Sequence, residues 1–258
     1  MRGVAGVVVL SLSVAACVSP YVTAGLGRIN RPVSTVWVGA DKFVYVPGGK
    51  GYNFEFETAH SGRVIKPGMM YTDGGSIPRL AQIFKGFSPW GFGPAYIVHD
   101  WIFYARHCYL DRHLPNQARY RDDTRFADVY GKDGRRPITF DESATILAEV
   151  IKTIIDNGQV LPENVPAKVI SAAVDSVFAL ALWNEAGACE RQRVEPLDIA
   201  IVWVRLNEGR GSVPPTWKLS PWEIAQAKEK LPFARQIVHS LKPLPKRPKP
   251  DGRIAQSR

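Results

Sequence analysis

Residues 93–109 read GPAYIVHDWIFYARHCY, and this apolar, aromatic-rich stretch predicts a helix over about 94–109. Pro94 suits the first position of a helix, because its missing N–H has no partner there in any case. His99 and Asp100 form an adjacent ionisable pair inside the apolar run. Burying such a pair costs roughly several kcal/mol unless it is partnered. The pair is therefore either held by polar contacts or used for chemistry.

The sequence before this helix predicts β-structure between about 34 and 72. Short runs of β-branched and aromatic residues lie at 35–38, 43–46, 52–57 and 63–66, and glycines at 48–51 supply turn chemistry between two of them. The sequence after it predicts more helices. Thr139 and Glu142 have capping-box spacing at the start of a helix that Asn157-Gly158 ends.

A third helix is expected over about 166–186, a strand over 199–206, and an irregular insertion rich in Arg and Asp over 113–136. The resulting expectation is an α+β fold, with N-terminal antiparallel β-hairpins packed on a small cluster of three to four helices.

The composition is that of an ordinary globular chain. It has 258 residues, of which 45% are hydrophobic and 22% are charged, which excludes a wholly disordered chain, a collagen-like repeat and a coiled-coil rod. We expect one domain over 34–241 after a tether of 17–33. Residues 242–258 hold six basic residues and one acidic residue among prolines, which predicts a disordered tail.

The formal net charge of +9 is therefore concentrated in that tail. We expect a solvated tail, with contact to anionic lipid or cell-wall polymer as the functional alternative. Nucleic-acid binding is not expected, because the chain carries no basic-aromatic surface motif.

The first residues predict export. Residues 1–16 combine Arg2, a short apolar run and small residues, which is typical of a secretory signal peptide and too short to cross a bilayer. Val14-Ala15-Ala16-Cys17 resembles a bacterial lipobox, which implies that Cys17 is lipidated and anchors the chain to a membrane. Val18 stands where Asp would imply retention at the inner membrane, so the resemblance implies an outer-membrane lipoprotein facing the periplasm. The alternative is an ordinary signal with an incidental cysteine.

Cys108 and Cys189 are the cysteines that remain. In an oxidising compartment a disulfide between them would persist and would stabilise the fold by about 4 to 5 kcal/mol in the chain-entropy model. Two buried free thiols are the alternative, since the sequence gives no distance.

A second polar stretch, Asp73-Gly74-Gly75-Ser76, precedes the His99 helix by about two dozen residues. We expect the loop and the helix to form one polar site for hydrolysis or metal binding. His99 is the proposed base, Asp100 the metal ligand or orienting acid, and Asp73 a second acid, while Gly74, Gly75 and Ser76 would contact the ligand. The alternative is that these residues only tie the loop to the helix.

The two stretches resemble an uncharacterised bacterial and phage domain family. That family is marked by a Thr-Asp-x-x-Ser-Ile-Pro-Arg segment, matched here at 72–79, and by a His-Asp-x-x-Tyr helix. The resemblance covers about 35–187 and defines a domain of unassigned function. Phe103 occupies the tyrosine position, and the family's second-helix aspartate has no direct match, which leaves Asp141 and Asp128 as candidates.

A weaker likeness is to secreted phospholipase A2, whose Gly-rich calcium loop precedes a helix with adjacent His and Asp. The likeness implies that Asp100 and loop carbonyls hold Ca²⁺, that His99 deprotonates water and that Asp141 orients His99. The disulfide framework of that family is absent. A Ser76–His99 triad lacks a Gly-x-Ser-x-Gly elbow. A zinc site is disfavoured because His99 and His107 lie about 12 Å apart along a helix.

Overall fold

The computed structural model divides into two compact units, Met1–Val194 and Glu195–Arg258, and each is described by itself. The predicted single domain of 34–241 therefore spans both units. The structure describes residues 20–39, 42–48, 53–72, 91–115, 123–131, 135–160, 175–208, 220–222, 225–226 and 229. The predicted signal peptide, Cys17, the loop 73–76 and the tail 242–258 all lie outside these residues.

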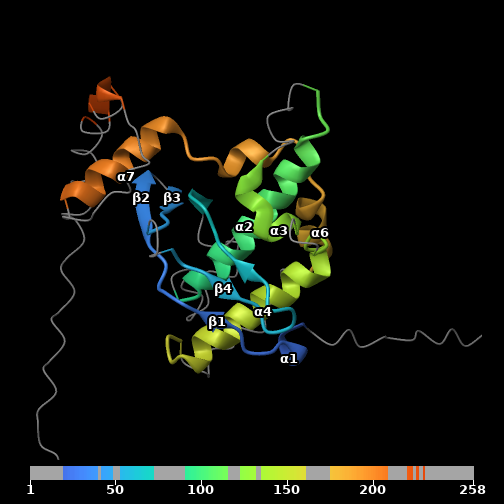
Figure 1. Cartoon of the computed structure of the whole chain (residues 1–258). Coiled ribbons are helices and arrows are strands. Elements are labelled where there is room, and N and C mark those ends of the chain that lie inside the picture. The colour runs from blue at the N-terminus through green and yellow to red at the C-terminus, as the bar shows by residue number, and fades with distance from the viewer. Residues whose placement is uncertain are drawn as a thin grey trace, which may run out of the picture. The chain divides into compact units, whose positions relative to one another are not determined.

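The strands of the first unit pair in antiparallel fashion, which confirms the expected α+β class (Figure 1). Within the described residues they form two three-stranded sheets. In one sheet β4 (Phe56–Glu57) lies between β1 (Arg28–Ile29) and β5 (Val64–Ile65). In the other, β3 (Lys42–Tyr45) lies between β2 (Thr35–Gly39) and β6 (Met70–Thr72). Val44 of β3 pairs with Val36 on one side and Tyr71 on the other.

Two long helices pack on each other beside these sheets (Figure 1). They are α2 (Gly93–Asp111) and α4 (Phe140–Asp156), close to the ranges that the sequence predicts. The Thr139 side chain accepts a hydrogen bond from the Glu142 N–H, which is the N-cap half of the expected capping box. Gly158 follows α4 with φ 69°, a left-handed conformation that glycine adopts without steric cost.

The centre of the first unit is an aromatic cluster on α2. Trp101 and Tyr104 pack against Phe126, with ring centroids 4.6 and 5.0 Å apart. Phe126 ends the 3-10 helix η2 (Thr124–Phe126), which continues into α3 (Ala127–Tyr130). Residues 124–130 of the predicted irregular insertion are therefore helical. The expectation was wrong there because Phe126 and Val129 are buried and fix the segment against α2 and β5.

A disulfide joins Cys108 of α2 to Cys189 of the 3-10 helix η3 (Cys189–Gln192), with the Cα atoms 4.6 Å apart. The buried carboxylate of Asp111 reinforces this junction by accepting hydrogen bonds from the backbone N–H groups of Gly187 and Cys189, at 2.5 and 2.9 Å. Helix α2 and the segment around η3 are thus linked both covalently and by hydrogen bonds.

The expected tether of 17–33 is wrong over its described part, because residues 20–33 carry packed elements. Helix α1 (Pro20–Thr23) and strand β1 lie beside α4 (Figure 1). The Gly27 N–H donates to Thr153 Oγ1 at 2.9 Å. A Cβ at Gly27 would collide with the Phe56 ring, so this glycine permits close packing where the sequence suggested flexibility.

The expected strand over 199–206 is also wrong, because these residues belong to α7 (Pro196–Glu208) of the second unit. Pro196 begins the helix, Asp198 lies in its first turn, and Ile199 N–H donates to the Glu195 carbonyl. These start signals outweigh the strand preference of the β-branched residues.

The helix expected over 166–186 is shorter in the described residues. Helix α6 (Val177–Trp183) begins at the Ser176 cap, and residues 161–174 lie outside the described part. No helix among the described residues has the length and apolar composition to span a bilayer.

Candidate functional site

Two predicted motifs meet at the end of β6. Thr72, the last residue of β6, donates from Oγ1 to Asp100 Oδ2 of α2 over 2.7 Å, and both side chains are buried. The Asp100 backbone carbonyl also lies 3.5 Å from Gln192 Nε2 of η3. The first residue of the Thr72–Arg79 motif is therefore bonded to the second residue of the His99-Asp100 motif.

His99 lies beside this contact with a side chain that is 16% exposed. Its Nδ1 is 3.9 Å from Asp100 Oδ1, which is an ion-pair distance but too long for a hydrogen bond. Its ring packs on Phe103 with centroids 4.3 Å apart. Its Nε2 is buried and has no hydrogen-bond partner in the described part of the chain. Within the described residues His99 is thus not tied to backbone, and its buried Nε2 is left without a partner there.

Of the other predicted site residues, only Asp141 and Asp128 can be placed relative to His99. Asp73, Gly74, Gly75 and Ser76 lie outside the described residues. Asp141 is exposed in the first turn of α4, and its backbone carbonyl accepts from Thr145 Oγ1 at 3.0 Å. No ion pair between described residues joins Asp141 to His99. The orienting role expected for Asp141 is therefore not supported.

Asp128, the second candidate for that role, lies against a different residue of α2. Its Oδ2 accepts from the Lys66 N–H at 2.7 Å and from Trp101 Nε1 at 3.1 Å. Burial raises the pKa of its carboxyl above the ordinary value, and these hydrogen bonds oppose the rise. Its Oδ1 is buried and unpartnered within the described part of the chain. Asp128 therefore connects the end of β5 to the aromatic cluster.

The zinc alternative has no support from the described residues. His107 Nε2 lies 2.8 Å from the Leu182 carbonyl, and Asp111 is engaged by backbone N–H groups. His113 is exposed and accepts from Arg112. No three His, Cys, Asp or Glu side chains among the described residues come together to hold a metal ion.

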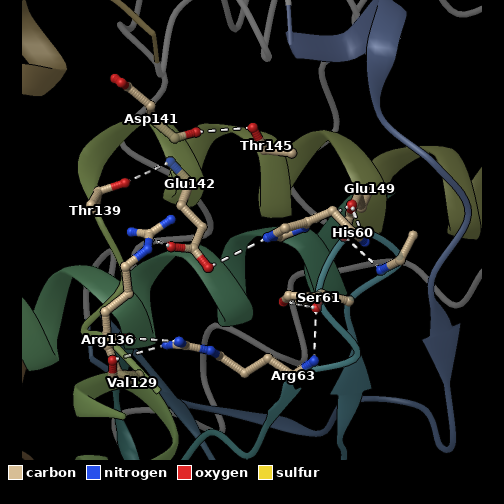
Figure 2. A network of polar contacts seen from close by, with 12 residues as sticks. His60, Ser61, Arg63, Val129, Arg136, Thr139, Asp141, Glu142, Thr145 and Glu149 are labelled. Carbon is tan, nitrogen blue, oxygen red and sulfur yellow. Dashed lines mark hydrogen bonds and ion pairs between the residues drawn. The ribbon is translucent and has the colours of Figure 1, made fainter. Parts of the chain in front are cut away.

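A second polar cluster, which the sequence reasoning missed, lies between α4 and the β4–β5 turn (Figure 2). Glu149 of α4 is 0% exposed, and its carboxylate accepts from the N–H groups of Ala59 and His60 at 2.9 and 3.0 Å. His60 Nδ1 is 2.9 Å from Glu149, and His60 Nε2 is 3.4 Å from Glu142. The imidazole thus lies between two carboxylates, and we call His60, Glu142 and Glu149 the His60 cluster.

Two arginines extend the His60 cluster toward α3 (Figure 2). Arg136 Nη1 is 3.1 Å from Glu142 Oε2. The buried Arg63 guanidinium donates to the carbonyls of Val129 and Arg136 at 3.2 and 2.6 Å, and burial lowers its pKa. These contacts join the β4–β5 turn, α3 and α4, so the arrangement has a structural role.

One signal for this cluster was present in the sequence. Glu142 and Glu149 are seven residues apart, which places them on one face of a helix. Glu149 also interrupts the apolar stripe of α4, where an unpartnered carboxylate would be costly. The histidine between them could not be identified, because it is 82 and 89 residues away along the chain.

Comparison of the chain with protein-family models, curated proteins and solved structures found no match.

Proposed function

We propose that this chain is an envelope lipoprotein whose His99 acts as the general base of a hydrolytic site. The observation that carries the proposal is the environment of the two His99 ring nitrogens. Nδ1 lies beside Asp100, and Nε2 has no partner within the described residues. A neutral imidazole with its proton on Nδ1, facing the carboxylate, would leave the Nε2 lone pair to accept a proton from water, and this requires water to reach the buried Nε2.

Thr72 and Asp100 would orient that base. Thr72 Oγ1 holds one carboxylate oxygen of Asp100, so the other oxygen is directed toward His99. The 3.9 Å separation from Nδ1 must shorten for a hydrogen bond to form. Catalytic hydrogen bonds commonly tighten in this way when substrate binds.

Calcium is the metal that the phospholipase likeness implies. It takes six to eight oxygen ligands at about 2.3–2.6 Å. At this site the described residues offer the Asp100 carboxylate, one oxygen of which already accepts from Thr72. This set does not fill a calcium shell, so the metal would require donors from the loop 73–76, and no step is derived through it.

The substrate class follows from the proposed location. A diacylated Cys17 would hold the domain at a bilayer, since each buried methylene contributes about 0.8 kcal/mol, and would place the site near phospholipid esters. The basic tail would add attraction to anionic headgroups. Cys17→Ser should abolish incorporation of labelled palmitate in a bacterial host, and unchanged labelling would contradict the anchor.

A non-enzymatic interaction module is the second candidate. The Thr72–Asp100 hydrogen bond favours it, because that contact by itself explains a buried carboxylate as a tie between β6 and α2. Under this reading His99 is a packing partner of Phe103 and performs no chemistry.

Fatty-acid release from mixed phospholipid vesicles by the purified full chain separates the two candidates. We expect His99→Gln to lower the rate by roughly 10²–10⁴-fold. His113→Gln, which changes an exposed histidine just beyond the C-terminal end of α2, should leave it unchanged. Measuring the release rate with added calcium and with a chelator tests whether the reaction depends on calcium.

The absence of release in both the calcium and the chelator arm would refute the hydrolase proposal and favour the interaction module. Release that survives His99→Gln would refute the role of His99. Release that survives the chelator would exclude only the calcium-dependent version.

A further inference from the structure

A pocket of about 420 Å³ lies against α2, on residues that the His99 site does not use. Its walls come from α2, α3, the segment 135–139, the first turn of α4 and the end of α6. Its volume falls within the range of small-molecule sites, about 300–1,000 Å³. The residues that determine its chemistry are four aromatic rings and two arginines: Tyr109, Tyr130, Phe140, Trp183, Arg106 and Arg136.

The aromatic walls are held in place by their own contacts. The Tyr130 hydroxyl donates to the Ala105 carbonyl at 2.8 Å, which fixes its ring beside α2. Phe140 and Trp183 meet edge to face with centroids 6.0 Å apart. Trp183 also packs edge-on against Phe103, at 5.1 Å. Rigid, flat apolar surfaces of this kind favour a flat apolar occupant.

Arg106 is a half-buried guanidinium with neutral partners. Its Nε lies 3.4 Å from the Trp183 carbonyl, and its Nη2 lies 3.2 Å from Asn184 Oδ1. Its guanidinium carbon lies 5.5 Å from the Trp183 ring centroid. Burial lowers the Arg106 pKa, and the neighbouring Tyr109 phenol opposes that effect. Since arginine keeps its charge in proteins, this cation lacks an anionic partner within the described part of the chain.

Arg136 adds a second cation at the pocket. Its side chain is 67% exposed, and its Nη1 pairs with Glu142, a carboxylate that is shared with His60. The other guanidinium nitrogens of Arg136 face no acidic group in the described residues. Arginine presents paired N–H donors that match the two oxygens of a carboxylate.

We propose that this pocket binds a small aromatic carboxylate, with its flat body among the four aromatic rings and its anionic group at Arg106 and Arg136. The site is independent of the proposed hydrolysis, since it uses neither His99 nor Asp100.

Isothermal titration calorimetry of the full chain with 2-naphthoate tests this assignment. Three further probes separate the contributions: 2-naphthamide lacks the charge, octanoate lacks the flat ring, and acetate lacks the apolar body. We expect saturable binding of 2-naphthoate and binding at least about tenfold weaker for each of the other three, which corresponds to about 1.4 kcal/mol.

Two variants and two controls locate the binding. Arg106→Gln and Arg136→Gln should each weaken 2-naphthoate binding by at least about fivefold, as expected for losing a charge-assisted hydrogen bond. Arg28→Gln removes an exposed arginine that also pairs with a glutamate, outside the pocket, and should have no effect. His99→Gln should leave binding intact even if it abolishes hydrolysis.

Equal affinity for 2-naphthoate and 2-naphthamide would overturn the proposal. This comparison uses only the unmodified chain, so it does not depend on whether a variant folds. The absence of saturable binding at about 10 mM ligand, far weaker than typical sites, would also overturn it. So would affinity that is unchanged in both pocket variants.

Discussion

Two histidines beside carboxylates give this protein its clearest internal comparison. Each ring nitrogen of His60 lies within 3.4 Å of a glutamate carboxylate from α4, and one of those glutamates also caps the backbone of the turn that carries the histidine. Among the described residues, His99 has one carboxylate, at 3.9 Å, and its buried Nε2 has no partner.

The difference teaches that adjacency to an acid does not by itself indicate chemistry. His60 is fully engaged, so its hydrogen-bonding capacity is used to hold the β4–β5 turn on α4. His99 has a buried Nε2 that no described residue engages. The number of occupied ring nitrogens, which the sequence cannot show, distinguishes His60 from His99.

The largest effect on stability is expected at Glu149, on the structural side of this comparison. Glu149→Ala leaves two backbone N–H groups and His60 without their acceptor. The expected loss is about 3–5 kcal/mol in the free energy of unfolding, measured by urea denaturation. The control is Glu57→Ala, which removes an exposed ion pair with Arg28 and should cost less than about 1 kcal/mol. A loss at Glu149 no larger than that of the control would contradict the capping role.

A matched pair of histidine variants tests the comparison directly. His60→Gln should lower the free energy of unfolding by about 1–2 kcal/mol, because two carboxylates lose a partner. His99→Gln should cost less than about 1 kcal/mol, because only ring packing and a long contact are lost. Urea denaturation at neutral pH measures both. A larger loss at His99 than at His60 would reverse the structural assignment.

The smallest effect is expected at Asp128, a carboxylate with one engaged and one unpartnered oxygen. Its folded-state pKa is raised above the ordinary value of 3.8. The folded state therefore holds its proton to higher pH than the unfolded state, and the contribution of this group to stability falls as pH rises above 3.8.

Asp128→Asn should remove this dependence. The free energy of unfolding of the variant, relative to the parent chain, should increase between about pH 4 and pH 7. Denaturation series across that range measure the difference. A relative stability that stays flat or falls with rising pH would show that the hydrogen bonds from Lys66 and Trp101 outweigh burial.

Local signals predicted the main helices well. The apolar run with Pro94 gave α2, and the Thr139 cap with Asn157-Gly158 gave both ends of α4. These features act within one or two turns of the chain, so they can be read without knowing the fold. The α+β class followed from the same patterns.

The errors arose where nonlocal packing or a competing signal decided. Gly27 reads as flexible until the Phe56 ring is placed against it. The β-branched run at 199–206 is typical of a strand. Pro196 and Asp198, however, are typical of the start of a helix, and the segment is helical. The many arginines and aspartates of 113–136 favoured an irregular segment, although Phe126 within it is buried.

The sequence by itself determined the helix caps, the α+β class and the His99-Asp100 pair, because each depends on residues that are near one another in the chain. Tertiary structure alone decided which polar groups meet. It brought Thr72 to Asp100, Cys108 to Cys189 and His60 to the glutamates of α4, and it surrounded Arg106 with aromatic rings and neutral acceptors. The physical reason is that partnership of a buried polar group depends on distances across the fold, and residue spacing along the chain does not encode those distances.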